Sequence, residues 1–407
     1  MPSKRIVSRA LELGVRAFDT SPYYGPSELL LGAALSAVDP APPRSSLTLI
    51  TKAGRVGPSE FDYSAAHIRR SVRRSLERLN TDYLDLVYAH DVEFVTPAEV
   101  VTAVTELRRL RDEDGSVRHV GISGYPVDVL CDLAELVFRK TGEPLDAVMS
   151  YGNFTVQNRT LGLPEVLGGS DRQSPLSRLR AAGVDVVLNA SMLGMGLLTT
   201  SGIPPDPQPP AASPPLNGAV ASPLAIWHPS PPALRLACQR LSELSATAGE
   251  RLESVAIRWS LGEWARIGGA AGVGVPSVPP MGLRVGATVM GVTSVGELEE
   301  TVSEWNGARD GLVSSTINGA AGPNGTRPTP GDRERNEKIV RLVEGEMWSA
   351  LGAEWLDYSW ASPGEGYVNQ RVAAKQGAIP EGDSVLERHA DTKVGVRLAV
   401  TEAAVSA

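Results

Sequence analysis

The stretch Asp19-Thr-Ser-Pro-Tyr-Tyr-Gly25 decides how this 407-residue chain is expected to fold. It follows a short apolar run, Val15-Arg-Ala-Phe18, that is typical of a buried strand, and its proline and glycine end that strand in a turn. An acid and two tyrosines therefore stand at the carboxyl end of a strand. α/β folds gather their functional side chains at such ends.

Segments typical of strands and of helices alternate on both sides of this stretch. Predicted helices separate seven predicted strands, which lie at 15–20, 47–52, 83–90, 117–122, 147–151, 184–190 and 287–291. The alternation predicts an α/β fold with a parallel sheet covered by helices, one strand short of a closed (β/α)8 TIM-type barrel. The chain starts on a predicted helix at 4–13, so we expect the missing first strand to precede residue 1. Either the sequence is truncated at its start or another segment covers the gap.

The order of predicted strands, helices and irregular stretches also predicts how the chain is divided. We expect a barrel over 1–310, a flexible linker over 311–334, a helix and aromatic segment over 335–369 that dock on the barrel, and a poorly ordered tail over 370–407. Two further stretches, 201–232 and 268–286, are rich in proline or glycine and are expected to form long loops.

Composition excludes several classes of function. The net charge of −8 argues against non-specific nucleic-acid binding, which needs a basic surface. Two cysteines cannot form a disulfide framework, the five histidines show no ligand spacing, and no metal is expected. No segment resembles a signal peptide or a membrane span. We therefore expect a cytoplasmic protein, a monomer or weak homo-oligomer, that acts on a small molecule without a nucleic-acid or membrane partner.

Four titratable side chains stand at the ends of the first three predicted strands. Asp19 and Tyr24 follow the first, Lys52 ends the second and His90 ends the third. Each one alone is better explained by a turn, by packing or by solvation, but their joint placement favours a site. A lysine lowers the pKa of a nearby phenol, an aspartate fixes the lysine, and a histidine orients a substrate oxygen. Tyr24 would then act as general acid or base at an alcohol or carbonyl oxygen.

These residues resemble the aldo-keto reductase family. The matching segments are Phe18-Asp-Thr-Ser-Pro-Tyr-Tyr-Gly-Pro-Ser-Glu28, Ile50-Thr-Lys52 and Leu84-Asp-Leu-Val-Tyr-Ala-His90. The family's spacing of five residues from aspartate to tyrosine selects Tyr24 over Tyr23. The resemblance covers roughly residues 5–305 and implies a (β/α)8 barrel, a nicotinamide cofactor and no metal.

Further segments narrow the resemblance to the branch of L-galactose dehydrogenase and fungal D-arabinose dehydrogenase. They are Gly121-Ile-Ser-Gly-Tyr125 and the C-terminal Trp-x-x-Tyr-x-Trp-Ala-Ser-Pro-Gly pattern from Trp355 to Gly364. The branch implies oxidation of the anomeric carbon of an aldose to the aldonolactone, with hydride transfer to NAD. Two alternatives stay open: an NADPH-dependent aldehyde or ketone reductase, and a non-catalytic or truncated barrel that binds a cofactor as a scaffold.

The resemblance also assigns residues to the cofactor. Ser123 and Ser150 are expected to hold the nicotinamide amide, and Ser191, Leu193 and Gly196 to line the pyrophosphate. The segment after the last strand would reach the adenosine end; its expected contacts are Gly291, Thr293, Ser294, Glu297 and Glu300.

The same segment indicates which nicotinamide is used. Gly291 and Glu297 stand where NADP-preferring relatives carry basic residues, and a carboxylate repels a 2′-phosphate but accepts ribose hydroxyls. We therefore expect NAD rather than NADP, unless Glu297 is only an acidic residue in a first helical turn. At positions 124 and 190 the sequence has Gly124 and Ala190 instead of the residues that are common in the family. Both differences suit the branch of L-galactose and D-arabinose dehydrogenases.

Overall fold

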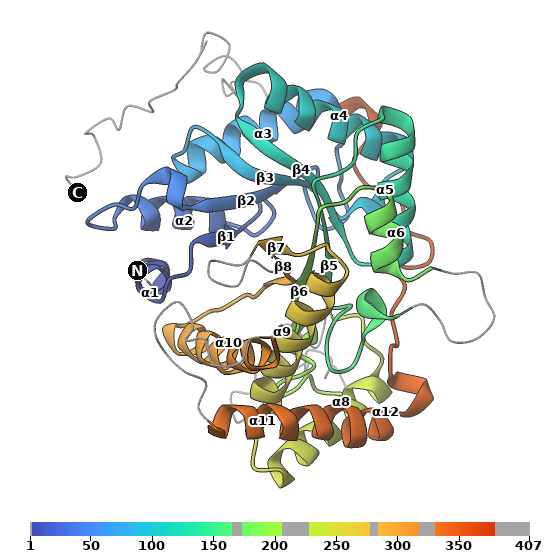
Figure 1. Cartoon of the computed structure of the whole chain (residues 1–407). Helices are drawn as coiled ribbons and strands as arrows, with labels where there is room; N and C mark the ends of the chain where they lie inside the picture. The colour runs from blue at the N-terminus through green and yellow to red at the C-terminus, as the bar shows by residue number, and fades with distance from the viewer. Residues whose placement is uncertain (1, 165–172, 206–227, 277–283, 317–329, 379–407) are drawn as a thin grey trace, which may run out of the picture.

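In the computed structural model, which describes residues 2–164, 173–205, 228–276, 284–316 and 330–378, seven strands form one parallel sheet whose order follows the chain (Figure 1). All seven predicted strands are present, although the first and last are shorter than expected. They are β1 (Ala17–Asp19), β2 (Thr48–Ala53), β3 (Leu84–His90), β4 (Val117–Gly124), β5 (Ala147–Tyr151), β6 (Val186–Ala190) and β9 (Ala287–Val289).

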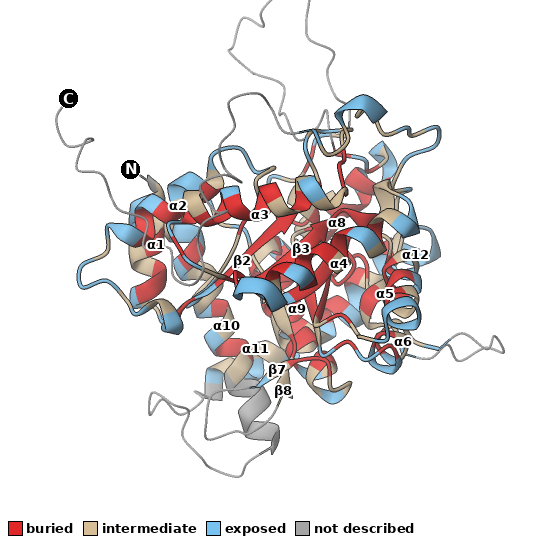
Figure 2. Ribbon diagram, turned by 90° about the horizontal axis from the view of Figure 1, so that it is seen from above, coloured by how far each residue is buried: buried red, intermediate tan, exposed pale blue. Residues whose placement is uncertain are grey.

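Helices follow the strands and cover the outer face of the sheet (Figure 1). They are α1 (Pro2–Glu12), α2 (Ser27–Ser36), α3 (Ala65–Leu79), α4 (Pro97–Asp114), α5 (Val127–Thr141), α6 (Pro175–Ala181), α8 (Pro232–Thr247), α9 (Leu252–Ala270) and α10 (Val295–Thr316). Local sequence fixes their ends: a capping box of Thr96 and Glu99 starts α4, and Gly115 in the left-handed region ends it. Figure 2 shows buried residues in the strands and on the helix faces that cover them.

The alternation of side chains along the strands builds two apolar layers. One set packs between sheet and helices, while Ile50, Leu86, Tyr88, Met149 and their neighbours fill the inside of the curved sheet. Gly121 makes room for this inner layer, because a Cβ there would lie 2.7 Å from the Tyr88 ring. The same period of two directs Lys52 and His90 to the inside, two residues beyond Ile50 and Tyr88.

β1 and β9 are the two edge strands of the sheet, and they flank the position where the eighth strand was expected. In the described residues, β1 pairs only with β2 and β9 only with β6. Helix α1 contacts both α2 and α10, and Arg9 on α1 forms an ion pair of 2.7 Å with Glu299 on α10. One helix therefore joins the two flanks of the sheet.

Several predicted loops prove more regular than expected. Helix α10 continues to Thr316, and α11 (Pro330–Arg341) begins inside the predicted linker. Charged side chains of α11 form ion pairs with the barrel. Arg335 on α11, for example, bonds to Glu250 and Glu304 at 2.8 and 3.0 Å. In the predicted loop 268–286, β7 (Val275–Pro276) pairs with β8 (Arg284–Val285). The centres of these stretches, 277–283 and 317–329, and residues 206–227 of the Pro-rich stretch lie outside the described residues.

After α11, a π-helical turn (Leu342–Met347) and α12 (Trp348–Trp355) lead into residues 356–378, called here the C-terminal strap. The strap contacts the segments that follow β2, β3 and β5. Residues 370–378 were expected to be poorly ordered but are held by side chains of the barrel; residues 379–407 lie outside the described part. The strap's contacts with the barrel are Arg159–Asp357 (2.5 Å), Glu93–Ser362 (3.0 Å), Phe61–Asn369 (2.9 Å) and Asp62–Arg371 (2.8 Å).

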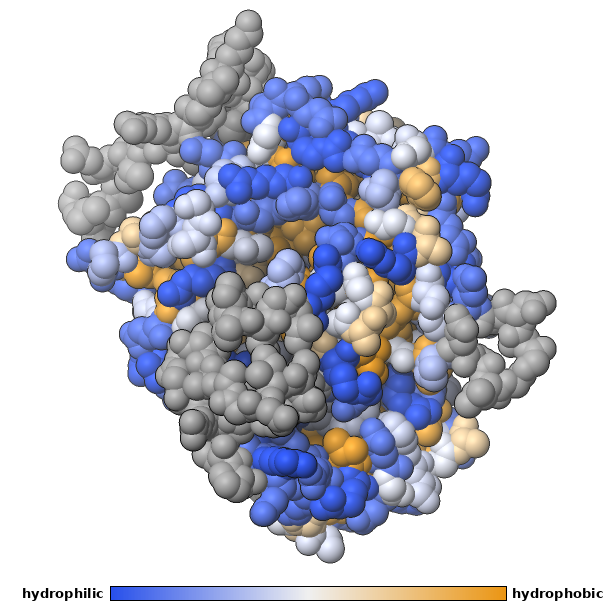
Figure 3. Space-filling model, viewed as in Figure 1, coloured by the Kyte–Doolittle hydropathy of each residue, from blue (hydrophilic) through white to orange (hydrophobic). Residues whose placement is uncertain are grey.

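The outer helices are hydrophilic, and apolar residues lie in the hollowed centre of the face seen in Figure 3. No helix among the described residues is long and apolar enough to cross a lipid bilayer.

Candidate active site

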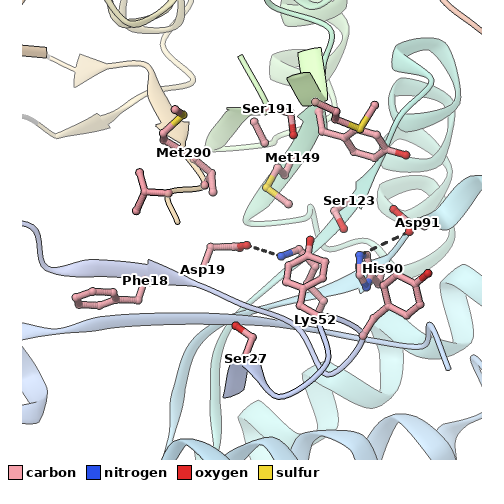
Figure 4. Close-up of a pocket in the computed structure, with 18 of the residues that line it drawn as sticks. Phe18, Asp19, Ser27, Lys52, His90, Asp91, Ser123, Met149, Ser191 and Met290 are labelled. Carbon is pink, nitrogen blue, oxygen red and sulfur yellow. Dashed lines mark hydrogen bonds and ion pairs between the residues drawn. The ribbon is translucent and has the colours of Figure 1, made fainter. Parts of the chain in front are cut away.

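The structure places Asp19 and Lys52 in direct contact at the carboxyl ends of β1 and β2. Lys52 Nζ donates to Asp19 Oδ1 at 2.5 Å and to the carbonyl oxygen of Thr20 at 3.0 Å (Figure 4). Burial works to lower the pKa of Lys52, but the Asp19 carboxylate, and after it Tyr24, outweighs burial and raises that pKa. The lysine is therefore held as an ammonium ion inside the protein.

Tyr24 stands over this pair. The Lys52 ammonium lies 4.8 Å from the centroid of the Tyr24 ring, and the residue is 46% exposed toward the cavity described below. The loss of water around the phenol raises its pKa; the Lys52 ammonium opposes this rise, and the charges of Asp19 and Asp91 add to it. The expected lowering is therefore wrong for the protein without ligands: Lys52 acts in the predicted direction, but the net pKa is raised.

His90 completes the set, and its Nδ1 contacts a buried serine hydroxyl. Ser21 Oγ accepts a hydrogen bond from the Tyr23 N–H at 3.1 Å, and it lies 3.2 Å from His90 Nδ1. When the Ser21 hydroxyl donates to Nδ1, the ring proton stands on Nε2, the nitrogen that faces Asp91. Burial lowers the pKa of His90 to about 4, so the ring is neutral near pH 7 and Nε2 is a donor.

All four side chains line one cavity of about 1130 Å³. Its wall includes Asp19, Lys52 and His90, then Ser123, Ser191 and Met290 (Figure 4), and it continues to residues of α1 such as Ile6 and Val7. Trp360 and Ser362 of the C-terminal strap form part of its wall. This volume is slightly above the usual range for a small-molecule site.

Three of the predicted cofactor residues, Ser123, Ser191 and Gly291, line this cavity. Ser191 has a positive φ of 55°, so the backbone turns sharply at the wall, and no atom within 4 Å would meet a Cβ at Gly291. Serine hydroxyls and open backbone are the donors that a nicotinamide dinucleotide needs, so these residues fit that group.

The other predicted cofactor residues lie elsewhere. The Ser150 hydroxyl is fully buried and donates to the Tyr125 carbonyl oxygen at 3.3 Å. Leu193 and Gly196 belong to the turn after Ser191 but do not line the cavity.

The polar side chains of the segment after β9 bond to one another at the start of the next helix, α10. Glu297 accepts bonds from Thr293 N at 2.6 Å and Thr293 Oγ1 at 2.9 Å, and Ser294 Oγ accepts from Glu297 N at 3.2 Å. The Glu300 carboxylate accepts from Ser254 at 2.8 Å. In the structure, Glu297 is therefore an acidic residue in the first turn of α10 that caps the helix through Thr293.

Sequence reasoning missed three residues of the cavity wall, Arg55, Asp91 and Trp360, and it missed Ser21, which lies behind the wall against His90. Ser21 lies inside the opening stretch and Asp91 directly follows His90, so both had a positional signal. Trp360 belongs to the aromatic segment that was expected to dock. Its stacking on Tyr125, with ring centroids 4.6 Å apart, joins segments too distant in sequence to be paired by pattern.

Comparisons with known proteins agree with this geometry. Residues 2–308 match the model of the Aldo/keto reductase family. The chain is 46% identical over 200 residues to D-arabinose 1-dehydrogenase of Saccharomyces cerevisiae, covering 49% of this chain and 56% of the yeast protein. It is 34% identical over 301 residues to L-galactose dehydrogenase of Arabidopsis thaliana, covering 73% and 81%.

Other matches are more distant. D-threo-aldose 1-dehydrogenase from a Pseudomonas species is 30% identical over 223 residues, covering 48% of this chain and 61% of that protein. Among solved structures, the holo form of aldo-keto reductase AKR11C1 from Bacillus halodurans superimposes with a TM-score of 0.48 at 20% identity, covering 83% of this chain and 86% of that one. The matched region spans just over half the length of the yeast relative.

Proposed function

The chain belongs to the aldo/keto reductase family, and we propose that it oxidises the anomeric carbon of an aldose to the aldonolactone with NAD as hydride acceptor. One observation carries the proposal: Tyr24, Lys52 and Asp19 lie together with the Nε2 donor of His90 on the wall of one cavity. The names of three relatives, all aldose or galactose dehydrogenases, support the choice of substrate.

Each side chain has a separate task in this reaction. His90 donates its Nε2–H to the oxygen on the anomeric carbon and orients it. Tyr24 removes the proton of that hydroxyl, and Lys52 favours the phenolate form of Tyr24 by its charge. Asp19 keeps the Lys52 ammonium in place.

Ser123, Ser191 and Gly291 would hold the nicotinamide cofactor along the cavity wall. When bound, that cofactor accepts the hydride from the anomeric C–H, so the C–O bond becomes the carbonyl of the lactone. The hydroxyl proton would thus go to Tyr24, and the hydride would go to the bound nicotinamide.

The test is oxidation of D-arabinose and of L-galactose by the purified full chain, with NAD and NADP in separate assays. We expect reduced nicotinamide to form with NAD and an aldonolactone to be recovered. If neither sugar is oxidised with either cofactor, the proposal fails.

A second candidate is reduction of aldehydes or ketones with NADPH. One observation favours it: the Glu297 carboxylate is folded onto Thr293 and is not directed to a ribose. Faster reduction of a simple aldehyde with NADPH than oxidation of either sugar with NAD would select this candidate.

A further inference from the structure

Asp91 is a buried carboxylate at the cavity wall that the mechanism above does not use. It follows His90 at the end of β3, is 3% exposed and adopts a positive φ of 58°, which is uncommon for a residue other than glycine. Its Oδ2 lies 3.6 Å from His90 Nε2 (Figure 4). A charge buried on strained backbone costs stability, and such residues cluster at functional sites.

Arg55 holds this carboxylate in place. Its guanidinium forms an ion pair with Asp91, donates to the Tyr23 hydroxyl at 3.1 Å and to the Pro58 carbonyl oxygen at 3.2 Å. The guanidinium also lies 3.8 Å from the centroid of the Tyr23 ring. With its donors used in this way, Arg55 acts as a positioning residue, and Asp91 is the charged acceptor next to His90.

We propose that Asp91 binds the substrate hydroxyl on the carbon next to the reacting carbon, and so selects 2-hydroxy sugars. The inference rests on the proposed function, in which His90 Nε2 donates to the oxygen of the reacting carbon. An N–H donor and a carboxylate 3.6 Å apart complement two oxygens on neighbouring carbons, because such oxygens also lie about one hydrogen-bond length apart. The first oxygen accepts from His90, and the second donates its proton to Asp91.

The charge of Asp91 also reaches the reacting centre. It is one of the charges that raise the pKa of Tyr24, which places the carboxylate within electrostatic range of the phenol. The rings of Tyr24 and His90 lie 5.8 Å apart between centroids, so a hydroxyl bound to Asp91 next to His90 would lie near the oxygen on which Tyr24 acts.

D-Arabinose and 2-deoxy-D-ribose test the inference directly, because they share their configuration at carbons 3 and 4 and differ only in the hydroxyl at carbon 2. For the wild-type protein we expect kcat/KM to be roughly 10- to 100-fold higher for D-arabinose, the range for a hydrogen bond to a charged group. This comparison needs no variant.

Two substitutions then assign the preference to Asp91. Asp91→Asn and Asp91→Gly both suit the positive φ, so they change the side chain without adding backbone strain. We expect the ratio between the two sugars to fall several-fold in Asp91→Asn and to approach 1 in Asp91→Gly. Asp85→Asn is the matched control: Asp85 lies at the other end of β3 in an ion pair of 2.6 Å with Arg44, and its loss should leave the ratio unchanged.

The outcomes separate the inference from the function on which it rests. If wild-type protein oxidises both sugars equally well, or if the Asp91 variants lose activity on both sugars by the same factor, Asp91 only positions His90 and the inference is overturned while the function stands. If no aldose is oxidised, both are overturned.

Discussion

Lys52 Nζ donates to Asp19 Oδ1 at 2.5 Å while its side chain is 1% exposed, so the two charges neutralise each other inside the barrel. The second carboxylate oxygen of Asp19, Oδ2, is buried with no hydrogen-bond partner among the described residues. Asp19 therefore depends on its contact with Lys52, and removing either side chain leaves the other charge buried without its counter-ion.

This dependence predicts a separation of stability from activity. Lys52→Met should lower the free energy of unfolding by roughly 3–5 kcal/mol, because breaking a buried pair strands one charge. The double variant Asp19→Asn with Lys52→Met should recover much of that stability but none of the turnover. Urea unfolding and sugar oxidation of the three proteins check this. A double variant as unstable as the single one would contradict the ion pair.

Tyr24 is predicted to carry the proton transfer. Tyr24→Phe removes only the hydroxyl, so we expect kcat to fall by roughly 10²- to 10⁴-fold, the usual contribution of general acid–base catalysis. Binding of NADH, followed by fluorescence titration, should be unchanged. Tyr23→Phe is the neighbouring control, because the Tyr23 hydroxyl accepts from Arg55 and not from Lys52. Equal turnover of Tyr24→Phe and wild type would disprove the role of Tyr24.

Glu297 is predicted to favour NAD over NADP. Its carboxylate lies at the N-terminal end of α10 and repels a phosphate there, whether or not it also caps the helix. Glu297→Lys should raise kcat/KM with NADP relative to NAD about tenfold, equivalent to ~1.4 kcal/mol. Glu299→Lys, on the same helix but paired with Arg9, serves as control. An unchanged cofactor ratio in Glu297→Lys would limit Glu297 to capping.

The sequence predicted the barrel and the meeting of four side chains because both follow from short-range rules. Alternation of strand and helix sets the parallel sheet, and a period of two directs Lys52 and His90 to its inside. The lengths of β1 and β9 were overestimated because both are edge strands of the described sheet, and pairing on one side only shortens them.

The position of Trp360 and the net pKa shift of Tyr24 escaped prediction because they depend on contacts between distant segments. Trp360 reaches the cavity only because the C-terminal strap is tied to the barrel at Arg159, Glu93 and Asp62. The pKa of Tyr24 was predicted from Lys52 alone, but burial and the charge of Asp91 are known only once the chain is folded. The sequence thus indicated the four candidate side chains and the direction in which Lys52 acts on the pKa of Tyr24, but not the burial and the Asp91 charge that oppose it.

Glu93 is predicted to make stability depend on pH. Its Oε1 accepts from Tyr125 N and from Ser362 Oγ, each at 3.0 Å, while Oε2 is buried without a partner among the described residues. Burial, together with the charge of Asp91, raises the pKa of Glu93 to about 8. A carboxyl whose pKa is raised on folding contributes its full stability below its unfolded pKa, near 4.5, and loses it as pH rises through the folded value.

We therefore expect the midpoint of thermal unfolding to fall as pH rises from 5 to 8.5, because the unfolded chain gives up the Glu93 proton at lower pH than the folded protein does. Glu93→Gln keeps an acceptor for Tyr125 and Ser362 but cannot ionise, so its midpoint should change less over the same range. Glu354→Gln removes an exposed carboxylate on α12 and should show the wild-type slope. A wild-type midpoint that is flat across this range, or equal slopes for Glu93→Gln and wild type, would show that Glu93 is already ionised in the folded protein.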